Sequence, residues 1–265
     1  MSIEFQRKEQ YNINDLIEIV RLLRLPEGCP WDREQTHRSI RGNLIEEAYE
    51  VIEAIESYDT ENLKEELGDL LLQVVMHAQM EREENRFAFA DVVHDVAYKL
   101  VERHPHVFGT VIAENGEQAL DSWEAVKRST KNQETFTQTL ESVPKSFPAL
   151  MRAQKVQKRA AKAGFDWDEM SGALEKVKEE ADELLWATEK TAAEELGDLF
   201  FSVVNVSRFL GIDSELALQK ATDKFISRFA GVEALALERG IDMKTASLEE
   251  LDKLWDEVKQ QRNSR

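Results

Sequence analysis

The sequence predicts an all-α protein built from two tandem copies of one helical unit. Three observations predict this class. Its 265 residues include only five prolines and eleven glycines, and the abundant Glu, Leu, Ala and Lys favour helices over sheets. Apolar residues recur at helical spacing along most of the chain. The hexapeptide EELGDL occurs twice, at Glu65–Leu70 and at Glu194–Leu199.

The first half contains a series of helical patterns. Apolar stripes predict helices over Leu16–Leu23, Leu44–Ile55 and Leu63–Ala78. A fourth helix runs from about Phe89 to His104, where Pro105 ends it because proline cannot continue a helix. A fifth, shorter helix surrounds Trp123. Only the segment HVFGTVIA, near residue 110, has the character of a strand, and it is too short to change the class.

The helical pattern lapses between the two halves. Residues 127–148 are polar, rich in Thr and Gln, and end in two prolines, which is typical of a connection. We therefore predict an N-terminal helical domain over residues 1–130, a linker over 131–147 and a C-terminal helical domain over 148–265.

Helices resume in the second half, where Pro148 lies in a first turn and Gly164 follows the end of that helix. The remaining helices are predicted over Asp168–Glu189, Thr191–Leu210, Asp213–Arg239 and Ser247 to the C-terminus. Ser247 and Glu250 have the spacing of a capping box for the last helix.

The two halves share five landmarks in the same order, which indicates a duplication. The pairs are Trp31-Asp32 with Trp167-Asp168, the EEAxE motifs Glu46–Glu50 and Glu179–Glu183, the two EELGDL copies, Lys99/Arg103 with Lys224/Arg228, and Trp123–Lys127 with Trp255–Lys259.

The acidic motifs place carboxylates on common helix faces. Glu47 and Glu50 share one side of a predicted helix, and Glu66 and Asp69 share one side of the next. If these helices pack antiparallel, the four carboxylates converge. The second half repeats the arrangement with Glu180, Glu183, Glu195 and Asp198. Because such charges repel each other, a hard divalent cation such as Mg²⁺ or Mn²⁺ would stabilise the cluster. The alternative is a solvated acidic face of the common kind.

Two features favour metal binding over a solvated face. Each cluster abuts an apolar stripe, and a glycine, Gly68 or Gly197, lies within each acidic helix, where it costs about 1 kcal/mol relative to alanine. We expect these glycines to mark close helix packing. All five histidines lie in the first half and none occupies a ligand position, which disfavours a di-iron centre. Hydrolysis by water with a carboxylate base fits better.

Two basic pairs recur in register with the carboxylates, each at i, i+4 on a predicted helix: Lys99 with Arg103, and Lys224 with Arg228. They are either the basic side of an amphipathic helix or phosphate contacts, and their register favours phosphate. Trp123 and Trp255 are either core residues or stacking partners for a base. His104 and His106 fit a turn around Pro105.

The charge and composition restrict the partners. A formal net charge of −18 disfavours a nucleic-acid polymer, which needs a basic surface. No segment approaches eighteen consecutive apolar residues, so we expect no membrane span. The first residues lack a signal-peptide pattern, and the single cysteine, Cys29, permits no intrachain disulfide. We therefore expect a cytoplasmic protein.

The combined motifs resemble the MazG nucleoside triphosphate pyrophosphohydrolases. The resemblance rests on EExxE followed by ExxD on paired helices, doubled along the chain, with CPWD at Cys29–Asp32 and GFDW at Gly164–Trp167. It implies an all-α nucleoside triphosphate (NTP) pyrophosphatase fold and a homodimer whose domains form four-helix-bundle cores. It also implies Mg²⁺-dependent cleavage between the α and β phosphates, with broad tolerance of ribo- and deoxynucleotide bases.

The resemblance also implies roles for individual residues. The metal ligands would be Glu180, Glu183, Glu195 and Asp198 in the second half and Glu47, Glu50, Glu66 and Asp69 in the first. Lys224 and Arg228, or Lys99 and Arg103, would contact phosphates, Trp255 would lie near the base, and Lys176 would line the nucleotide pocket. Glu179 or Glu194 would orient the attacking water.

The second half is favoured as the active one, because no His-Pro-His segment interrupts it between Arg228 and Trp255. It departs from the expected pattern at Thr191–Ala193, which offers no basic residue. Two alternatives stay open: a narrower pyrophosphatase for one damaged or modified nucleotide, and a regulatory binding protein whose N-terminal half contacts a protein partner.

Overall fold

The protein is described by a computed structural model that covers residues 3–116, 118–120, 122, 123, 126 and 135–263. These residues contain helices, turns and loops, and no β-strand occurs among them. The predicted helix around Trp123 lies largely outside them. The chain divides into two compact units, unit 1 over Met1–Lys131 and unit 2 over Asn132–Arg265. Among the described helices, none is long and apolar enough to span a membrane.

Unit 1 confirms the first four helices predicted for the first half. Its elements are α1 (Ile13–Leu23), α2 (Pro30–Glu34), α3 (Arg41–Glu56), α4 (Thr60–Glu83), α5 (Phe89–Arg103) and α6 (Pro105–Phe108). The short α6 lies in the segment considered as a strand, where Pro105 occupies the first helical position.

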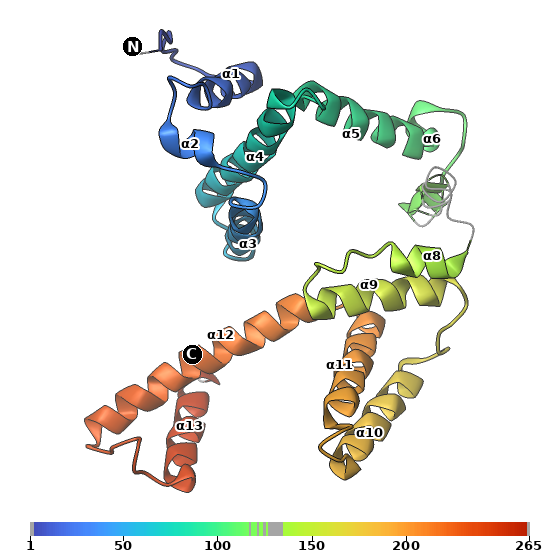
Figure 1. Ribbon diagram of the computed structural model, residues 1–265. Coiled ribbons are helices and arrows are strands. Elements are labelled where there is room, and N and C mark those ends of the chain that lie inside the picture. The colour runs from blue at the N-terminus through green and yellow to red at the C-terminus, as the bar shows by residue number, and fades with distance from the viewer. Residues whose placement is uncertain (1–2, 117, 121, 124–125, 127–134, 264–265) are drawn as a thin grey trace. The chain divides into compact units, whose positions relative to one another are not determined.

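Local sequence sets the helix ends of unit 1. The side chain of Asn12 accepts a hydrogen bond from the Asn14 amide at 2.9 Å, and Asp15 accepts one from the Asn12 amide, which caps α1. Tyr58 has a φ of 57° in the turn after α3, and the Asp59 side chain then caps α4. This turn lets α3 and α4 pack side by side (Figure 1).

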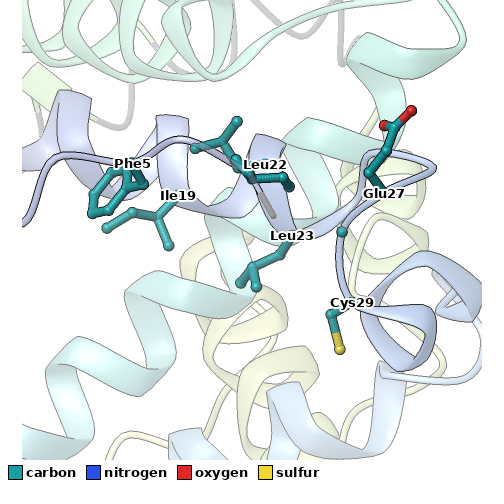
Figure 2. Close-up of a pocket in the computed structure, with 8 residues that line it drawn as sticks. Phe5, Ile19, Leu22, Leu23, Glu27 and Cys29 are labelled. Atoms are coloured by element: carbon teal, nitrogen blue, oxygen red, sulfur yellow. The ribbon is translucent and has the colours of Figure 1, made fainter. Parts of the chain in front are cut away.

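A small apolar core joins α1 and α4 in unit 1. Its buried members are Val20, Ile40, Val75, Met76 and Met80. An apolar pocket of about 380 Å³ lies beside α1 and the residues around it. Figure 2 shows Phe5, Ile19 and Leu22 together, whereas the Glu27 carboxylate and the Cys29 sulfur point in different directions. Because its polar groups do not converge, this pocket offers no evident chemistry.

Unit 2 also follows the predicted order. Its elements are α8 (Phe136–Glu141), α9 (Ala149–Lys162), α10 (Met170–Trp186), α11 (Ala192–Phe209), α12 (Ser214–Glu238) and α13 (Leu248–Asn263). Helices α10 and α11 pack side by side, and α13 packs against α12 (Figure 1). A core of Val232, Ala236, Leu254 and Val258 holds the second pair together. The Ser247 hydroxyl accepts from the Glu250 amide at 3.3 Å, which is one half of the expected capping box.

Helix α8 lies inside the segment that the sequence assigned to the linker. It packs on α9, where Arg159 donates hydrogen bonds to the Thr139 carbonyl and, at 2.8 Å, to the Ser142 hydroxyl. The polar residues of this segment therefore bond to unit 2, and the described part of the linker from residue 135 onward is structured. Polarity alone did not reveal this, because the partner arginine lies on the following helix.

The expectation of close packing at Gly68 and Gly197 is wrong within each unit. A Cβ added at either glycine would meet no atom within 4 Å. The opposite holds at Gly231, where an added Cβ would lie 2.8 Å from Cγ1 of Val258 across the α12–α13 contact. Close packing at a glycine therefore occurs at Gly231 between α12 and α13, and not at Gly68 or Gly197.

Candidate metal centres

Three carboxylates converge between α10 and α11 of unit 2. Glu180 and Glu183 come from α10 and Glu195 from the first turn of α11, and one oxygen of each lies within 4.8 Å of the others. The spacing of Glu180 and Glu183 places both on the side of α10 that faces α11. The predicted convergence is confirmed for these three residues. Asp198 is not part of this group, although its charge acts on Glu195.

The carboxylates of this cluster have too little positive charge around them to compensate their negative charges. Loss of hydration raises the pKa of Glu195, and the charges of Glu183, Glu194 and Glu180 raise it further. Glu180 is only 4% exposed, and its Oε2 has no hydrogen-bond partner. A buried, unpaired carboxylate oxygen is costly, so it fits a position where a cation would bind.

One basic side chain enters the cluster from α10. Lys176 Nζ lies 2.5 Å from Oε1 of Glu180 and 2.8 Å from Oε1 of Glu179. The hydrogen bonds to Glu179 and Glu180 raise the pKa of Lys176. The structure therefore brings together two predicted types of residue, metal ligands and a substrate-contacting lysine.

The cluster borders an open cavity of about 560 Å³. Glu179, Glu183 and Glu195 line it, together with Asp182, Trp186 and Ala187. Trp186 is 82% exposed and was not singled out from the sequence. It follows Glu183 by three residues on the same helix, and this i, i+3 spacing was the signal that could have identified it. Glu194, the other predicted catalytic residue, does not line the cavity, and its charge reaches Glu195 from the neighbouring position.

Unit 1 repeats the cluster with Glu47 on α3 and with Glu66 and Asp69 on α4. All three are half-buried, and their ligand oxygens lie within 4.8 Å of one another. Loss of hydration raises the pKa of Glu47, followed by the charges of Asp69 and Glu50. It also raises the pKa of Glu66, on which Glu50 acts next. The charge of Glu50 therefore acts on both Glu47 and Glu66, although Glu50 is not a member of the converging group.

The two clusters differ in their internal cation. Asn43 occupies the position in unit 1 that Lys176 occupies in unit 2, four residues before the second glutamate of EEAxE. Among the described residues of unit 1, no Lys or Arg forms an ion pair with Glu47, Glu66 or Asp69. Only the cluster of unit 2 carries a lysine.

The predicted phosphate and base contacts lie on other helices. The Arg228 guanidinium lies 5.8 Å from the centroid of the Trp255 ring, and the Phe225 ring lies 5.2 Å from that ring. Trp255 also packs against the α12–α13 core, so it is both a core neighbour and a partner for a cation. Arg103 stacks similarly over Trp123 at 5.4 Å in unit 1. No hydrogen bond or ion pair among the described residues joins Lys224, Arg228 or Trp255 to the acidic cluster, and the same holds for Lys99 and Arg103.

A comparison with known protein families matches these same regions. The MazG nucleotide pyrophosphohydrolase domain matches residues 35–108 and 169–232. The first match contains the cluster of Glu47, Glu66 and Asp69, and the second contains that of Glu180, Glu183 and Glu195. The chain belongs to the MazG family. The predicted all-α fold class and the predicted family are confirmed, and the MazG domain occurs twice, as the internal repeat indicates.

Relatives of this MazG chain share nearly its full length. A protein named nucleoside triphosphate pyrophosphohydrolase from Escherichia coli (strain K12) is 45% identical over 256 residues, which cover 94% of this chain and 97% of that protein. One named nucleoside triphosphate pyrophosphohydrolase/pyrophosphatase MazG from Thermotoga maritima is 44% identical and covers 92% of this chain and 94% of its own. A protein of Bacillus subtilis named YabN is 46% identical over 91% of this chain and 50% of its own length.

Proposed function

We propose that this MazG chain is a Mg²⁺-dependent nucleoside triphosphate pyrophosphohydrolase. It cleaves NTPs and dNTPs between the α and β phosphates, which releases a nucleoside monophosphate and pyrophosphate. The observation that carries the proposal is the cluster of Glu180, Glu183 and Glu195, in which a buried carboxylate oxygen has no partner. The names of the relatives support the same class of reaction.

The residues of the cluster fit a hard divalent cation. The donor set is made of carboxylate oxygens, which Mg²⁺ and Mn²⁺ prefer. Loss of hydration and then the neighbouring carboxylates raise the pKa of Glu195, and a bound cation would offset both effects. Glu180, Glu183 and Glu195 would hold the ion, with Asp198 beside them. A bound cation would supply positive charge that neutralises the phosphates and polarises the bond to be broken.

The protein's own side chains perform the remaining tasks. Glu179 lines the cavity, so we assign to it, or to Glu194, the role of accepting the proton of the attacking water. Lys176 is positioned to exchange a carboxylate for a phosphate oxygen when the triphosphate enters. Lys224 and Arg228 supply further phosphate contacts. We assign catalysis to unit 2, because its acidic cluster borders a cavity and, among the described residues, is the one of the two clusters that pairs with a lysine.

We propose that the active form is a homodimer. In one chain no hydrogen bond or ion pair among the described residues joins the basic pair of α12 to the acidic cluster, although both belong to the same proposed site. The same helix exposes Phe225, Ile226 and Phe229, a row that a second copy would cover to complete a helical bundle. Size-exclusion chromatography with light scattering measures the mass of the protein in the fractions that carry activity. A monomeric mass in those fractions would contradict the proposal.

Because the residues assigned to this site would bind phosphate and metal rather than the base, we propose broad base tolerance. We also propose a cytoplasmic role in maintaining nucleotide pools. Phosphorus NMR of ATP and dGTP, incubated with the protein with and without Mg²⁺, tests the reaction. Monophosphate plus pyrophosphate appearing only with metal supports the proposal. Diphosphate plus orthophosphate would mean cleavage of another bond, and an unchanged spectrum with every NTP would contradict the activity.

A further inference from the structure

A second cavity in unit 2 lies between α9, the loop before α10, and α11. Its volume is about 380 Å³, within the range of about 300–1,000 Å³ that small-molecule sites occupy. The residues that carry the argument are Gln157, Phe165, Trp167, Phe201, Asn205 and Arg208, all of which line it. The acidic cluster does not contribute to this cavity, so its chemistry is separate.

Two buried amides face this cavity with their orientations fixed. Gln157 is 6% exposed and donates through Nε2 to the Phe201 carbonyl at 2.7 Å. Its Oε1 is left buried and without a partner. Asn205 is 8% exposed, and its Oδ1 accepts from Nε of Arg208 at 2.9 Å. The Nδ2 of Asn205 therefore remains a donor that no described residue uses. The cavity is therefore lined by one acceptor, Oε1 of Gln157, and one donor, Nδ2 of Asn205, that are available to a ligand.

The arginine that orients Asn205 is itself held in place. Arg208 forms a two-pronged ion pair with Asp166, of which the Nη1–Oδ2 distance is 2.8 Å. Asp166 also accepts from the amide of Trp167, at the centre of the GFDW motif. The Trp167 ring rests on the first turn of α10, because a Cβ at Gly172 would lie 2.3 Å from its Cδ1. The GFDW loop thus builds a rigid wall with exposed aromatic faces.

The duplicated unit carries a different residue at the position of Asn205. Aligning the EELGDL motifs places Met76 of unit 1 at the position of Asn205. Met76 is buried in the apolar core with Val20, Val75 and Met80. This position therefore holds an apolar core residue in unit 1 and an amide in unit 2, where the buried Oε1 of Gln157 in the same cavity has no partner. A buried polar group without a partner is costly, and a bound ligand or an ordered water can supply that partner.

The cavity lies along the helix that carries the metal ligands. Asn205 follows Asp198 by seven residues, or two turns, so both lie on nearly the same face of α11 and about 10 Å apart along its axis. A flat ligand there could stack on Trp167 or Phe165, while a donor and an acceptor on its edge bond to Gln157 and Asn205. A nucleobase has these properties: it is planar, it stacks through its π-face, and its edge carries adjacent hydrogen-bond donors and acceptors.

We infer that this cavity binds a nucleobase, with Gln157 Oε1 accepting from an exocyclic or ring N–H and Asn205 Nδ2 donating to a neighbouring acceptor. The base belongs either to the substrate nucleotide of the proposed reaction or to a second nucleotide. The link to catalysis rests on the proposed function, whereas binding of the base does not. Trp255, predicted to lie near the substrate base, is on α13 and does not line this cavity.

The test begins with binding in the absence of phosphate and metal. The full chain is titrated with adenosine, guanosine, cytidine and uridine while the side-chain amide signals of Asn205 and Gln157 are followed by ¹⁵N NMR. We expect both to shift with at least one nucleoside. The variant Asn205→Met copies the residue of unit 1 and is expected to weaken binding at least tenfold. Gln79→Met is the control, because it removes an equally buried amide, 8% exposed, from unit 1.

Turnover then distinguishes the source of the base. If the substrate base binds here, Asn205→Met raises KM for NTPs several-fold and leaves the metal affinity unchanged. If a second nucleotide binds, KM is unchanged, and added nucleoside alters kcat of the wild type but not of Asn205→Met. No amide shift with any nucleoside, or equal affinity in Asn205→Met and wild type, would overturn the inference. Binding without pyrophosphate release would retain this site and refute the proposed function instead.

Discussion

The ammonium group of Lys176 lies 2.5 Å from one carboxylate oxygen of Glu180, one turn further along α10. The other oxygen of Glu180 is buried and has no hydrogen-bond partner. The lysine therefore pairs with one oxygen of Glu180 and leaves the other oxygen available to a cation. This relationship has no counterpart in unit 1, where Asn43 replaces the lysine.

Replacing Lys176 with Met should have opposite effects on metal and on substrate. Without a competing ammonium, Mg²⁺ alone should bind about tenfold more tightly, equivalent to about 1.4 kcal/mol. KM for ATP should rise, because a phosphate contact is lost. Calorimetry with Mg²⁺ and steady-state kinetics measure the two effects. Lys178→Met, an exposed lysine on the same helix, is the control. Weaker Mg²⁺ binding in Lys176→Met would contradict this role.

Neutral replacements of the ligands should identify the catalytic unit. We expect Glu180→Gln or Glu195→Gln to reduce pyrophosphate release about 100-fold or more, because stabilisation of the transferring phosphoryl group is lost. Glu47→Gln and Glu66→Gln are the matched changes in unit 1 and should retain most of the activity. The reverse pattern would assign catalysis to unit 1. Circular dichroism checks that each variant keeps its helical content.

Glu83 should make the stability of unit 1 depend on pH. The hydrogen bond from Arg24, followed by that from Gln79, lowers the pKa of Glu83. A lowered pKa in the folded state stabilises the protein above the ordinary glutamate value of about 4.3, and this contribution is lost as the pH falls through the lowered value. Glu83→Gln should therefore reduce the free energy of unfolding at pH 7 by about 1 kcal/mol, allowing for solvent screening. The difference should shrink below pH 4.

Urea unfolding at pH 7 and at pH 3.5 measures this effect. Glu18→Gln is the matched control, since Glu18 pairs with Arg21 at the surface and should contribute less than about 0.5 kcal/mol. A difference for Glu83→Gln that does not change with pH would show that its charge is not responsible.

The glycines should respond to alanine in opposite directions. Gly231→Ala places a methyl group 2.8 Å from Val258 and should destabilise the α12–α13 pair by about 1–3 kcal/mol. Gly68→Ala and Gly197→Ala meet no atom within 4 Å and should stabilise their helices by up to about 1 kcal/mol. Thermal unfolding measures all three. Destabilisation by Gly197→Ala at concentrations where the protein self-associates would indicate that a second chain packs against it.

Much of the fold was predictable because its signals are local. Helical periodicity located the helices, and the caps formed by Asn12 and Asp59 lie within a few residues of the ends they define. The sequence failed where a partner is distant: α8 is held by Arg159 of the next helix, and the polar composition of its segment suggested a linker. The prediction of close packing at Gly68 and Gly197 was wrong for the same reason, because packing at a glycine depends on whether another helix approaches it.

The candidate site divides in the same way. The sequence by itself determined the all-α class, the duplication, the family and the carboxylates of each cluster, because spacing along a helix fixes which side chains share a face. Only the tertiary structure decided which oxygens converge across two helices and that Lys176 enters one cluster. It also revealed that Asn205 lines a cavity in unit 2, whereas Met76, at the equivalent position of unit 1, is buried in an apolar core. Burial and distance between elements are collective properties of packing, and no single segment encodes them.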